Sequence, residues 1–519
     1  MSRSAVREVS RGSFYLGLEQ LTMLTGGVFY SIIVLRMLGP ATYGILNLGQ
    51  AAIGLAGVLT TNIETYLERF VAEIDARGAQ HILRPLVRKI LLTKATLAVV
   101  AGILVVILSD AIATAYGYRD LRRLLPALAP LVLLEGAGYV LRVTLFGLQR
   151  FRSIWIVALC NSILKLAIVF TLWMLHEGVV ALVVGLVVVQ GLTVVGLAAL
   201  VLRFLPKMQG SGEEVPTHKK IWDYVLPLLG ARAFFLSGQH LNRLILGALM
   251  PARELGLASF ALLTIDRFIS LAAAVPNSLL PALSRLRGEK RDGAIEQVVT
   301  EGYRLVAAIS VAVMAATFCL AREAVWITGG HEFFGAILPL QILALTPLFR
   351  TMQQPLSMGF YTYEKTRTIF WLAGLKFVVE PLCYPLLIPR FGVAGVAMAS
   401  LLSSIAVFGP SLRIADHMFP ATVGARRRAT LTAWAIGALV LLLGWALHNL
   451  TEPWPGLSVR ILIFLAAVAG IVVIGRLVHG DDLRNLAEAT RRASAVRILL
   501  PFARLLDRLQ GRPVQAPGS

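Results

Sequence analysis

The side chains best suited to chemistry in this chain are arginines that lie inside long apolar stretches. A guanidinium group is always charged and binds phosphate oxygens through a planar fork, so an arginine-lined cavity suits a phosphorylated substrate. At roughly 100° per residue, Arg232 and Arg243 fall on one face of a predicted helix over residues 222–248. The sequence therefore predicts a substrate-binding site built from Arg232, Arg243, Arg267 and Arg350.

Three carboxylates in apolar stretches are candidates for coupling or gating, namely Glu19, Glu135 and Asp266. A carboxylate inside a membrane can carry a proton or a sodium ion, and we expect no other cofactor than H+ or Na+. A lone charge at the bilayer centre costs about 3 kcal/mol. We therefore expect the carboxylates and the arginines to share a hydrated interior.

Several of these charges also have purely structural interpretations. Snorkelling from helix ends explains Lys94, Arg142 and Arg304. Local ion pairs explain Asp266 with Arg267, and Glu64 or Glu68 with Arg69. Ties between helices explain Lys165, Lys376 and Glu380. The sequence leaves both kinds of interpretation open.

The composition is that of a membrane protein. The chain has 519 residues, of which 57% are hydrophobic and 15% charged, and its mean hydropathy is +0.74. A soluble chain would carry about 25% charged residues. The net charge of +20 does not indicate a nucleic-acid partner, because the basic residues lie in short segments between apolar stretches. The three cysteines have neither disulfide nor metal-site spacing.

We predict an all-α polytopic membrane protein with about fourteen transmembrane helices, each near the ~20 residues needed to cross a bilayer. The spans run over residues 14–37, 43–66, 86–108, 124–148, 153–175, 179–203, 222–248, 254–282, 296–320, 334–360, 367–389, 392–414, 428–448 and 457–478. The sixth is almost uniformly Val, Leu and Gly, which favours a lipid-facing helix. Lys and Arg are roughly four times more frequent on one side, which places both termini in the cytoplasm.

Segments of the first half recur in the second. Residues 149–155 are echoed by 364–370, an offset of 215, and residues 178–181 by 392–395, an offset of 214. Such echoes predict two six-helix lobes that insert the same way up, related by a pseudo-two-fold axis along the membrane normal. The predicted domains are an N-lobe over 1–204, a cytoplasmic linker over 205–221, a C-lobe over 222–415, two additional C-terminal helices over 416–478 and a cytoplasmic tail over 479–519.

The tail combines helical apolar spacing with many arginines. This pattern is typical of a basic amphipathic helix on anionic lipid, and a solvated tail explains it equally well.

Two stretches carry a family resemblance: residues 11–14 followed by 33–44, and the turn at 147–151. With these, the sequence resembles the polysaccharide-biosynthesis (Wzx-type) oligosaccharide flippases of the multidrug/oligosaccharidyl-lipid/polysaccharide (MOP) superfamily. The resemblance implies two lobes around a V-shaped cavity that work by alternating access. It implies transfer of an undecaprenyl-diphosphate-linked oligosaccharide, an O-antigen or exopolysaccharide repeat unit, across the bacterial inner membrane. The implied partners are this lipid-linked oligosaccharide, membrane lipids and polysaccharide polymerase or assembly proteins.

Four other functions stay open. A MATE-like cation-coupled drug antiporter needs acidic and aromatic side chains on its cavity walls to bind cations, and the basic second half of the chain argues against such a cavity. A peptidoglycan lipid II flippase also has fourteen spans, but such relatives carry key arginines in the first helix, where this chain has Glu19. A membrane glycosyltransferase needs a carboxylate- or His-bearing outer loop, and the longest predicted outer loops, 109–123 and 322–333, are short. A scaffold would not need buried charges.

Overall fold

The protein is seen in a computed structural model that describes residues 3–205 with gaps between 59 and 79, residues 237–448 without 239 and 273, and Phe464. All regular structure in these residues is helical. Eight of the helices are long and apolar enough to cross a membrane, and one bent pair adds a ninth. The chain is thus an all-α multi-pass membrane protein, as predicted. The predicted span 457–478, most of 222–248 and the tail 479–519 fall outside the described residues.

The chain forms two compact units. Unit 1 holds Met1–Ser259 and Ile327–Phe333, and unit 2 holds Phe260–Trp326 and Phe334–Ser519. The main helices of unit 1 are α1 (Arg3–Val58), α3 (Gln80–Tyr116), α4 (Leu121–Gly147), α5 (Phe151–Met174) and α6 (Val179–Phe204). Those of unit 2 are α9 (Ala274–Gly288), α10 (Asp292–Cys319), α12 (Ile337–Leu343), α13 (Pro347–Thr362), α14 (Thr366–Phe391), α15 (Val393–Met418) and α16 (Val423–His448). Two helices cross the division, α8 (Ala252–Ala272) and α11 (Ala321–Gly329).

The first two predicted spans are joined in α1. The helix is interrupted only at Gly39, whose φ of 66° lies in the left-handed region that glycine tolerates, and Pro40 follows. No outer loop separates the two spans, because a single residue makes the break.

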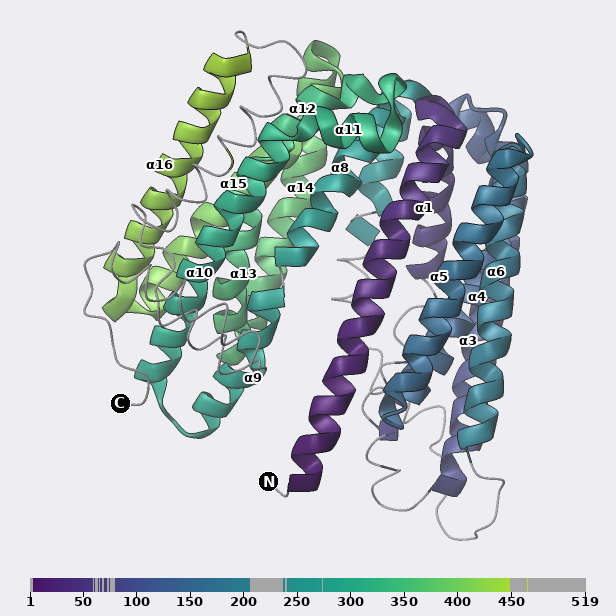
Figure 1. Ribbon diagram of the computed structural model, residues 1–519, viewed down its shortest axis with the longest axis horizontal. Helices are drawn as coiled ribbons and strands as arrows, with labels where there is room; N and C mark the ends of the chain where they lie inside the picture. Colours follow the sequence, from purple (N-terminus) through teal and green to yellow (C-terminus); the bar gives the residue numbers. More distant parts are fainter. Residues whose placement is uncertain are drawn as a thin grey trace. The chain divides into compact units, whose positions relative to one another are not determined.

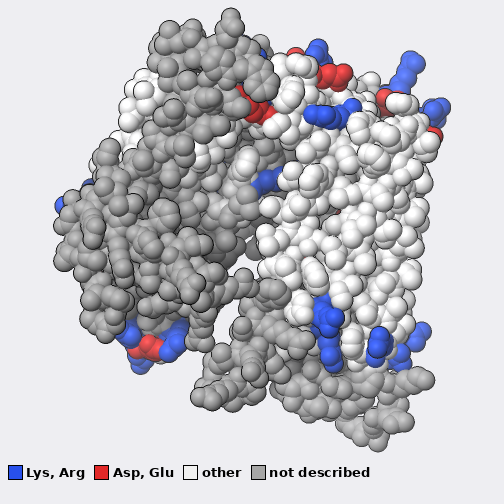
Figure 2. Space-filling view, viewed as in Figure 1, with Lys and Arg blue, Asp and Glu red and all other residues white. Residues whose placement is uncertain are grey.

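The helices of unit 1 form a bundle. Helix α3 packs against α4, α4 packs against α6, and α5 packs against both α1 and α6 (Figure 1). Leu83, Leu86 and Leu145 are fully buried between them. The visible face of this unit is uncharged through most of its length, with Lys and Arg towards its two ends (Figure 2). Such a surface suits a lipid environment.

Unit 2 is built around α10, which packs against α9, α13 and α16. The tenth predicted span is not one helix. The 3-10 helix η1 (His331–Ala336) and α12 lead into α13 at a bend of 50°, and Pro347 begins α13. Pro347 has no backbone N–H to donate to a carbonyl of α12, so the helical hydrogen bonds cannot continue through it, which explains the break.

The two turns that the sequence echo pairs also share their backbone conformation. Gln149 and Glu364 both have positive φ, 56° and 54°. In each turn the next residue donates to a carbonyl five positions back, Arg150 N to Leu145 O and Lys365 N to Phe360 O, both at 2.9 Å. These are the hydrogen bonds of a Schellman C-cap. His176 and Lys290 end their helices with the same kind of cap, so this geometry is common to several turns and the internal duplication stays a prediction.

Candidate functional site

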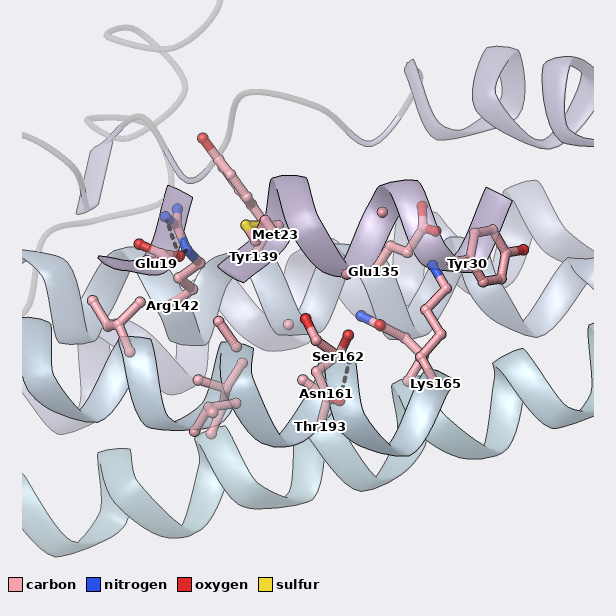
Figure 3. A pocket seen from close by; sticks show the side chains of 18 residues that line it. Glu19, Met23, Tyr30, Glu135, Tyr139, Arg142, Asn161, Ser162, Lys165 and Thr193 are labelled. Atoms are coloured by element: carbon pink, nitrogen blue, oxygen red, sulfur yellow. Dashed lines mark hydrogen bonds and ion pairs between the residues drawn. The ribbon is translucent and has the colours of Figure 1, made fainter. Parts of the chain in front are cut away.

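Unit 1 has a partly open cavity of about 310 Å³ between α1, α4, α5 and α6, lined by charged, uncharged polar and apolar side chains (Figure 3). Its ionisable lining residues are Glu19, Glu135, Arg142 and Lys165. Its uncharged polar lining residues are Tyr30, Tyr139, Asn161, Ser162, Gln190 and Thr193. The cavity thus brings together two of the three predicted coupling carboxylates with two of the cations for which structural interpretations were open.

Glu19 is buried at 3% exposure and is paired with Arg142. The Arg142 Nε and Nη2 atoms donate to one Glu19 oxygen at 3.0 and 2.7 Å. The prediction that Arg142 snorkels to the membrane surface is therefore wrong. A buried carboxylate on α1 is the better partner, because an unpaired charge there would carry the full desolvation cost.

Glu135 lies further along the cavity and interacts electrostatically with Lys165 (Figure 3). The Lys165 Nζ atom also lies 4.1 Å from the centroid of the Tyr30 ring, a cation–π distance. Lys165 thereby connects α5 to α4 and α1, as the interpretation of an inter-helix tie predicts.

The uncharged lining residues on α5 and α6 were not among the predicted site residues. Asn161 Nδ2 donates to Thr193 Oγ1 at 2.7 Å, and Gln190 lies one turn before Thr193 on α6. The prediction of a lipid-facing sixth span holds for one face only, since Val184 and Val188 are exposed while Gln190 and Thr193 line the cavity. The spacing of Gln190 and Thr193, three residues apart in an otherwise apolar helix, was the available signal.

A second charged cluster lies in unit 2. Asp266 on α8 forms an ion pair with Arg350 on α13. Lys376 on α14 interacts electrostatically with Arg350, Glu380 and Asp266. Glu380 accepts a hydrogen bond from Tyr384 at 3.2 Å and is 5% exposed. Among the described residues, Asp266 thus forms its ion pair with Arg350 on another helix, and not with its neighbour Arg267.

The other predicted arginines are placed as follows. Arg243 is half-buried and makes no hydrogen bond or ion pair with the described residues. Arg267 is exposed on α8. Arg232 lies outside the described residues. The His240 ring, one turn before Arg243, packs directly on the backbone of Gly54 in α1. A Cβ at Gly54 would lie 2.1 Å from this ring, so only glycine leaves room for it.

Lys94 is also a correction. It is 3% exposed, and its Nζ atom contacts a Glu64 carboxylate oxygen at 2.6 Å. The prediction that Lys94 snorkels is therefore wrong, while pairing of Glu64 or Glu68 with Arg69 lies outside the described residues. The pair ties α3 to the residues that follow α1, and its desolvated charges need each other.

The described residues contain no group of three or more His, Cys, Asp or Glu placed to bind a metal. The side chains of the two clusters can form ion pairs and hydrogen bonds, and their carboxylates can exchange a proton.

Comparison with known families assigns the chain. The model of the Polysaccharide biosynthesis protein family matches residues 33–338, more than half of the sequence. The chain belongs to this family. No curated protein sequence matches it.

Solved structures share the fold. A lipid II flippase MurJ in an inward closed conformation matches with a TM-score of 0.70 at 11% identity, over 88% of this chain and 98% of that one. An inward-facing multidrug resistance MATE family transporter matches with a TM-score of 0.60 at 13% identity, over 78% and 98%. A MOP superfamily transporter from Pyrococcus furiosus matches with a TM-score of 0.54 at 13% identity, over 79% and 96%. The chain shares the fold of these MOP superfamily structures, as the resemblance implies.

Proposed function

We propose that this protein moves a polyprenyl-diphosphate-linked oligosaccharide from the cytoplasmic to the outer leaflet of a bacterial inner membrane by alternating access. One combination carries the proposal: a member of a polysaccharide biosynthesis family has a transporter fold. Polysaccharide units that are assembled on a lipid in the cytoplasmic leaflet need a transport protein to reach the other leaflet. The cavity of unit 1 supports it, because ionisable and polar side chains between apolar helices suit a polar ligand such as a glycan.

Within this proposal the candidate groups for binding the diphosphate are arginines of the second half of the chain, each tested by itself: Arg232, Arg243, Arg267 and Arg350. Arg243 is the best placed of those described, since it is half-buried and has no described ion-pair partner. Arg350 must exchange Asp266 for phosphate oxygens. Glu19, Glu135 and Asp266 are the candidate groups for coupling to H+ or Na+, each being held by a cation that a proton would release.

The test is complementation in a polysaccharide-producing strain from which the gene has been deleted. Arg243→Ala should reduce surface polysaccharide at normal protein level, with lipid-linked oligosaccharide accumulating in the membrane. Arg413→Ala, an exposed arginine on α15, is the control and should complement fully. Full complementation by Arg243→Ala and Arg350→Ala would remove the proposed diphosphate site.

A lipid II flippase is the second candidate, favoured by the match that covers 98% of the MurJ chain. Its substrate shares the diphosphate and sugar chemistry. Rescue of cells depleted of their own lipid II flippase, without rescue of surface polysaccharide, would favour it.

A further inference from the structure

The cavity of unit 1 carries no net formal charge. Its carboxylates, Glu19 and Glu135, are matched by the cations Arg142 and Lys165. Arg142 donates two hydrogen bonds to Glu19. Lys165 interacts electrostatically with Glu135 and lies over the Tyr30 ring. A diphosphate would meet two carboxylates here, and an organic cation would meet two cations. Neither kind of ion is attracted by a balanced site in which each charge already has a partner.

The uncharged groups of the cavity suit a different ligand. Asn161 Nδ2 donates a hydrogen bond to Thr193 Oγ1, and the Thr193 hydroxyl donates to the Val189 carbonyl at 2.8 Å. The Asn161 amide oxygen therefore remains available as an acceptor. The Gln190 amide and the Ser162 hydroxyl make no hydrogen bond with the described residues. Amides and hydroxyls offer donors and acceptors side by side, which is what sugar hydroxyls need, because each both donates and accepts.

Glycines make the space. Gly26, Gly27 and Gly138 all line the cavity. A Cβ on Gly26 would lie 3.1 Å from Ser162, so that glycine lets α1 approach α5 closely. A Cβ on Gly27 would meet no atom within 4 Å, so that glycine leaves the cavity open. A volume of about 310 Å³ lies at the small end of the ligand-pocket range of ~300–1,000 Å³.

We infer that this cavity binds sugar residues of the substrate and selects the glycan, an inference that rests on the proposed function. Gln190, Ser162 and Asn161 hydrogen-bond the sugar hydroxyls. The Glu19–Arg142 ion pair and the interactions of Lys165 with Glu135 and Tyr30 hold α1, α4 and α5 at the separation that the sugar requires. A site that hydrogen-bonds hydroxyls strongly rejects ligands that lack them, because its polar groups are then left unsatisfied. The diphosphate is bound elsewhere, by arginines outside this cavity.

The test is a binding measurement on the full-length protein in lipid nanodiscs. Three probes are compared: lipid-linked oligosaccharide extracted from a strain that lacks the gene, the free oligosaccharide released from it by mild acid, and undecaprenyl diphosphate. Gly27→Leu fills the cavity without touching an ion pair. Gly17→Leu makes the same change on the same helix, at an exposed glycine outside the cavity with no atom within 4 Å of its Cβ.

Gly27→Leu should weaken binding of both glycosylated probes about tenfold or more and leave undecaprenyl diphosphate unchanged, and Gln190→Ala should have the same direction. Gly17→Leu should change none of them. Unchanged glycan binding in Gly27→Leu protein would overturn the inference, as would an equal loss for undecaprenyl diphosphate. Wild-type protein that binds free oligosaccharide but neither lipid probe would support the cavity site and overturn the proposed function. Wild-type protein that binds no glycosylated probe would overturn both.

Discussion

The guanidinium of Arg142 on α4 donates two hydrogen bonds, of 3.0 and 2.7 Å, to a single carboxylate oxygen of Glu19 on α1. The carboxylate is almost fully buried, while the Arg142 side chain is 39% exposed. This pair ties the first helix of the chain to the fourth at the wall of the polar cavity. Its partners are therefore unequal, because only one of them can turn to water.

That inequality predicts an asymmetric response to mutation. Arg142→Ala should lower the free energy of unfolding by about 2 kcal/mol, since it strands a buried carboxylate, with a discount for the exposure of Arg142. Glu19→Gln should cost less, because Arg142 can reach solvent. The measurement is unfolding of the purified protein in detergent. A larger loss for Glu19→Gln than for Arg142→Ala would contradict this account, and the double variant should recover part of the Arg142→Ala loss.

Arg350 should contribute to binding of the diphosphate. Arg350→Ala is expected to weaken binding of undecaprenyl diphosphate about tenfold, and Arg350→Lys to recover only part of it, because an ammonium group lacks the planar fork. Asp266→Asn removes the competing carboxylate and should strengthen binding. The measurement is titration of the protein in nanodiscs, with Arg413→Ala as control. Equal affinities in wild type and Arg350→Ala would exclude this arginine from the site.

Gly256 should tolerate no side chain. A Cβ on Gly256 would lie 1.8 Å from the Pro40 carbonyl oxygen, and one on Gly44 2.2 Å from that of Ala252, so α1 and the start of α8 are in backbone contact within unit 1. Gly256→Ala should force these helices apart and cost about 1–3 kcal/mol. Gly57→Ala, on α1 with no atom within 4 Å, is the control. The melting temperature in detergent reports both, and equal values would disprove the close contact.

Arg426 should be essential for anchoring α16. This arginine is fully buried, and its Nη2 atom donates to the Phe419 carbonyl at 2.7 Å and to Asp416 at 3.1 Å. Arg426→Met leaves these acceptors unsatisfied and should cost about 3–5 kcal/mol of unfolding free energy. Arg427→Met removes the other partner of Asp416, but that arginine is 66% exposed, and the loss should stay below about 1 kcal/mol. Similar losses in the two variants would contradict the role of burial.

Tyr363 should make stability depend on alkaline pH. Burial, and then the hydrogen bond that its hydroxyl donates to Asp292 at 2.9 Å, raise the Tyr363 pKa above its ordinary value of 10.0. The fold therefore favours the neutral phenol. Its contribution to stability is fully present below about pH 10 and is lost as pH rises through the raised pKa. Tyr363→Phe should make the melting temperature depend less on pH in this alkaline range. The same pH dependence in the variant and in the wild-type protein would refute the assignment.

Much of the fold could be predicted from the sequence, because helix spans are long and apolar and leave a strong periodic signal. Positions where one residue changes the path were less accessible. The break at Gly39 occupies too little sequence to separate from the helices around it, and the bend before Pro347 depends on how α12 and α13 pack. The sequence showed the turns at Gln149 and Glu364 only as a repeated pattern, and their left-handed backbone conformation could not be predicted from it.

The candidate site was predicted only in part, for a physical reason. Sequence identifies charges in apolar stretches, as with Glu19 and Glu135, but the partner of each charge depends on which helices are neighbours. Arg142 and Lys94 lie near predicted helix ends, where snorkelling is a sound expectation, yet each pairs with a buried carboxylate from another part of the chain. Uncharged lining residues such as Gln190 carry little signal, because a single amide costs far less to bury than a charge.

The most direct test of the central claim is a leaflet assay in proteoliposomes that contain extracted lipid-linked oligosaccharide. Mild periodate treatment in the cold, with a reagent that stays outside, oxidises only outer-leaflet glycans. Vesicles with wild-type protein should expose the inner-leaflet pool with time, while Gly27→Leu vesicles should keep it protected and Gly17→Leu vesicles should not. A pool that stays protected in vesicles with folded wild-type protein, at every imposed H+ or Na+ gradient, would contradict the claim that this chain moves a lipid-linked glycan.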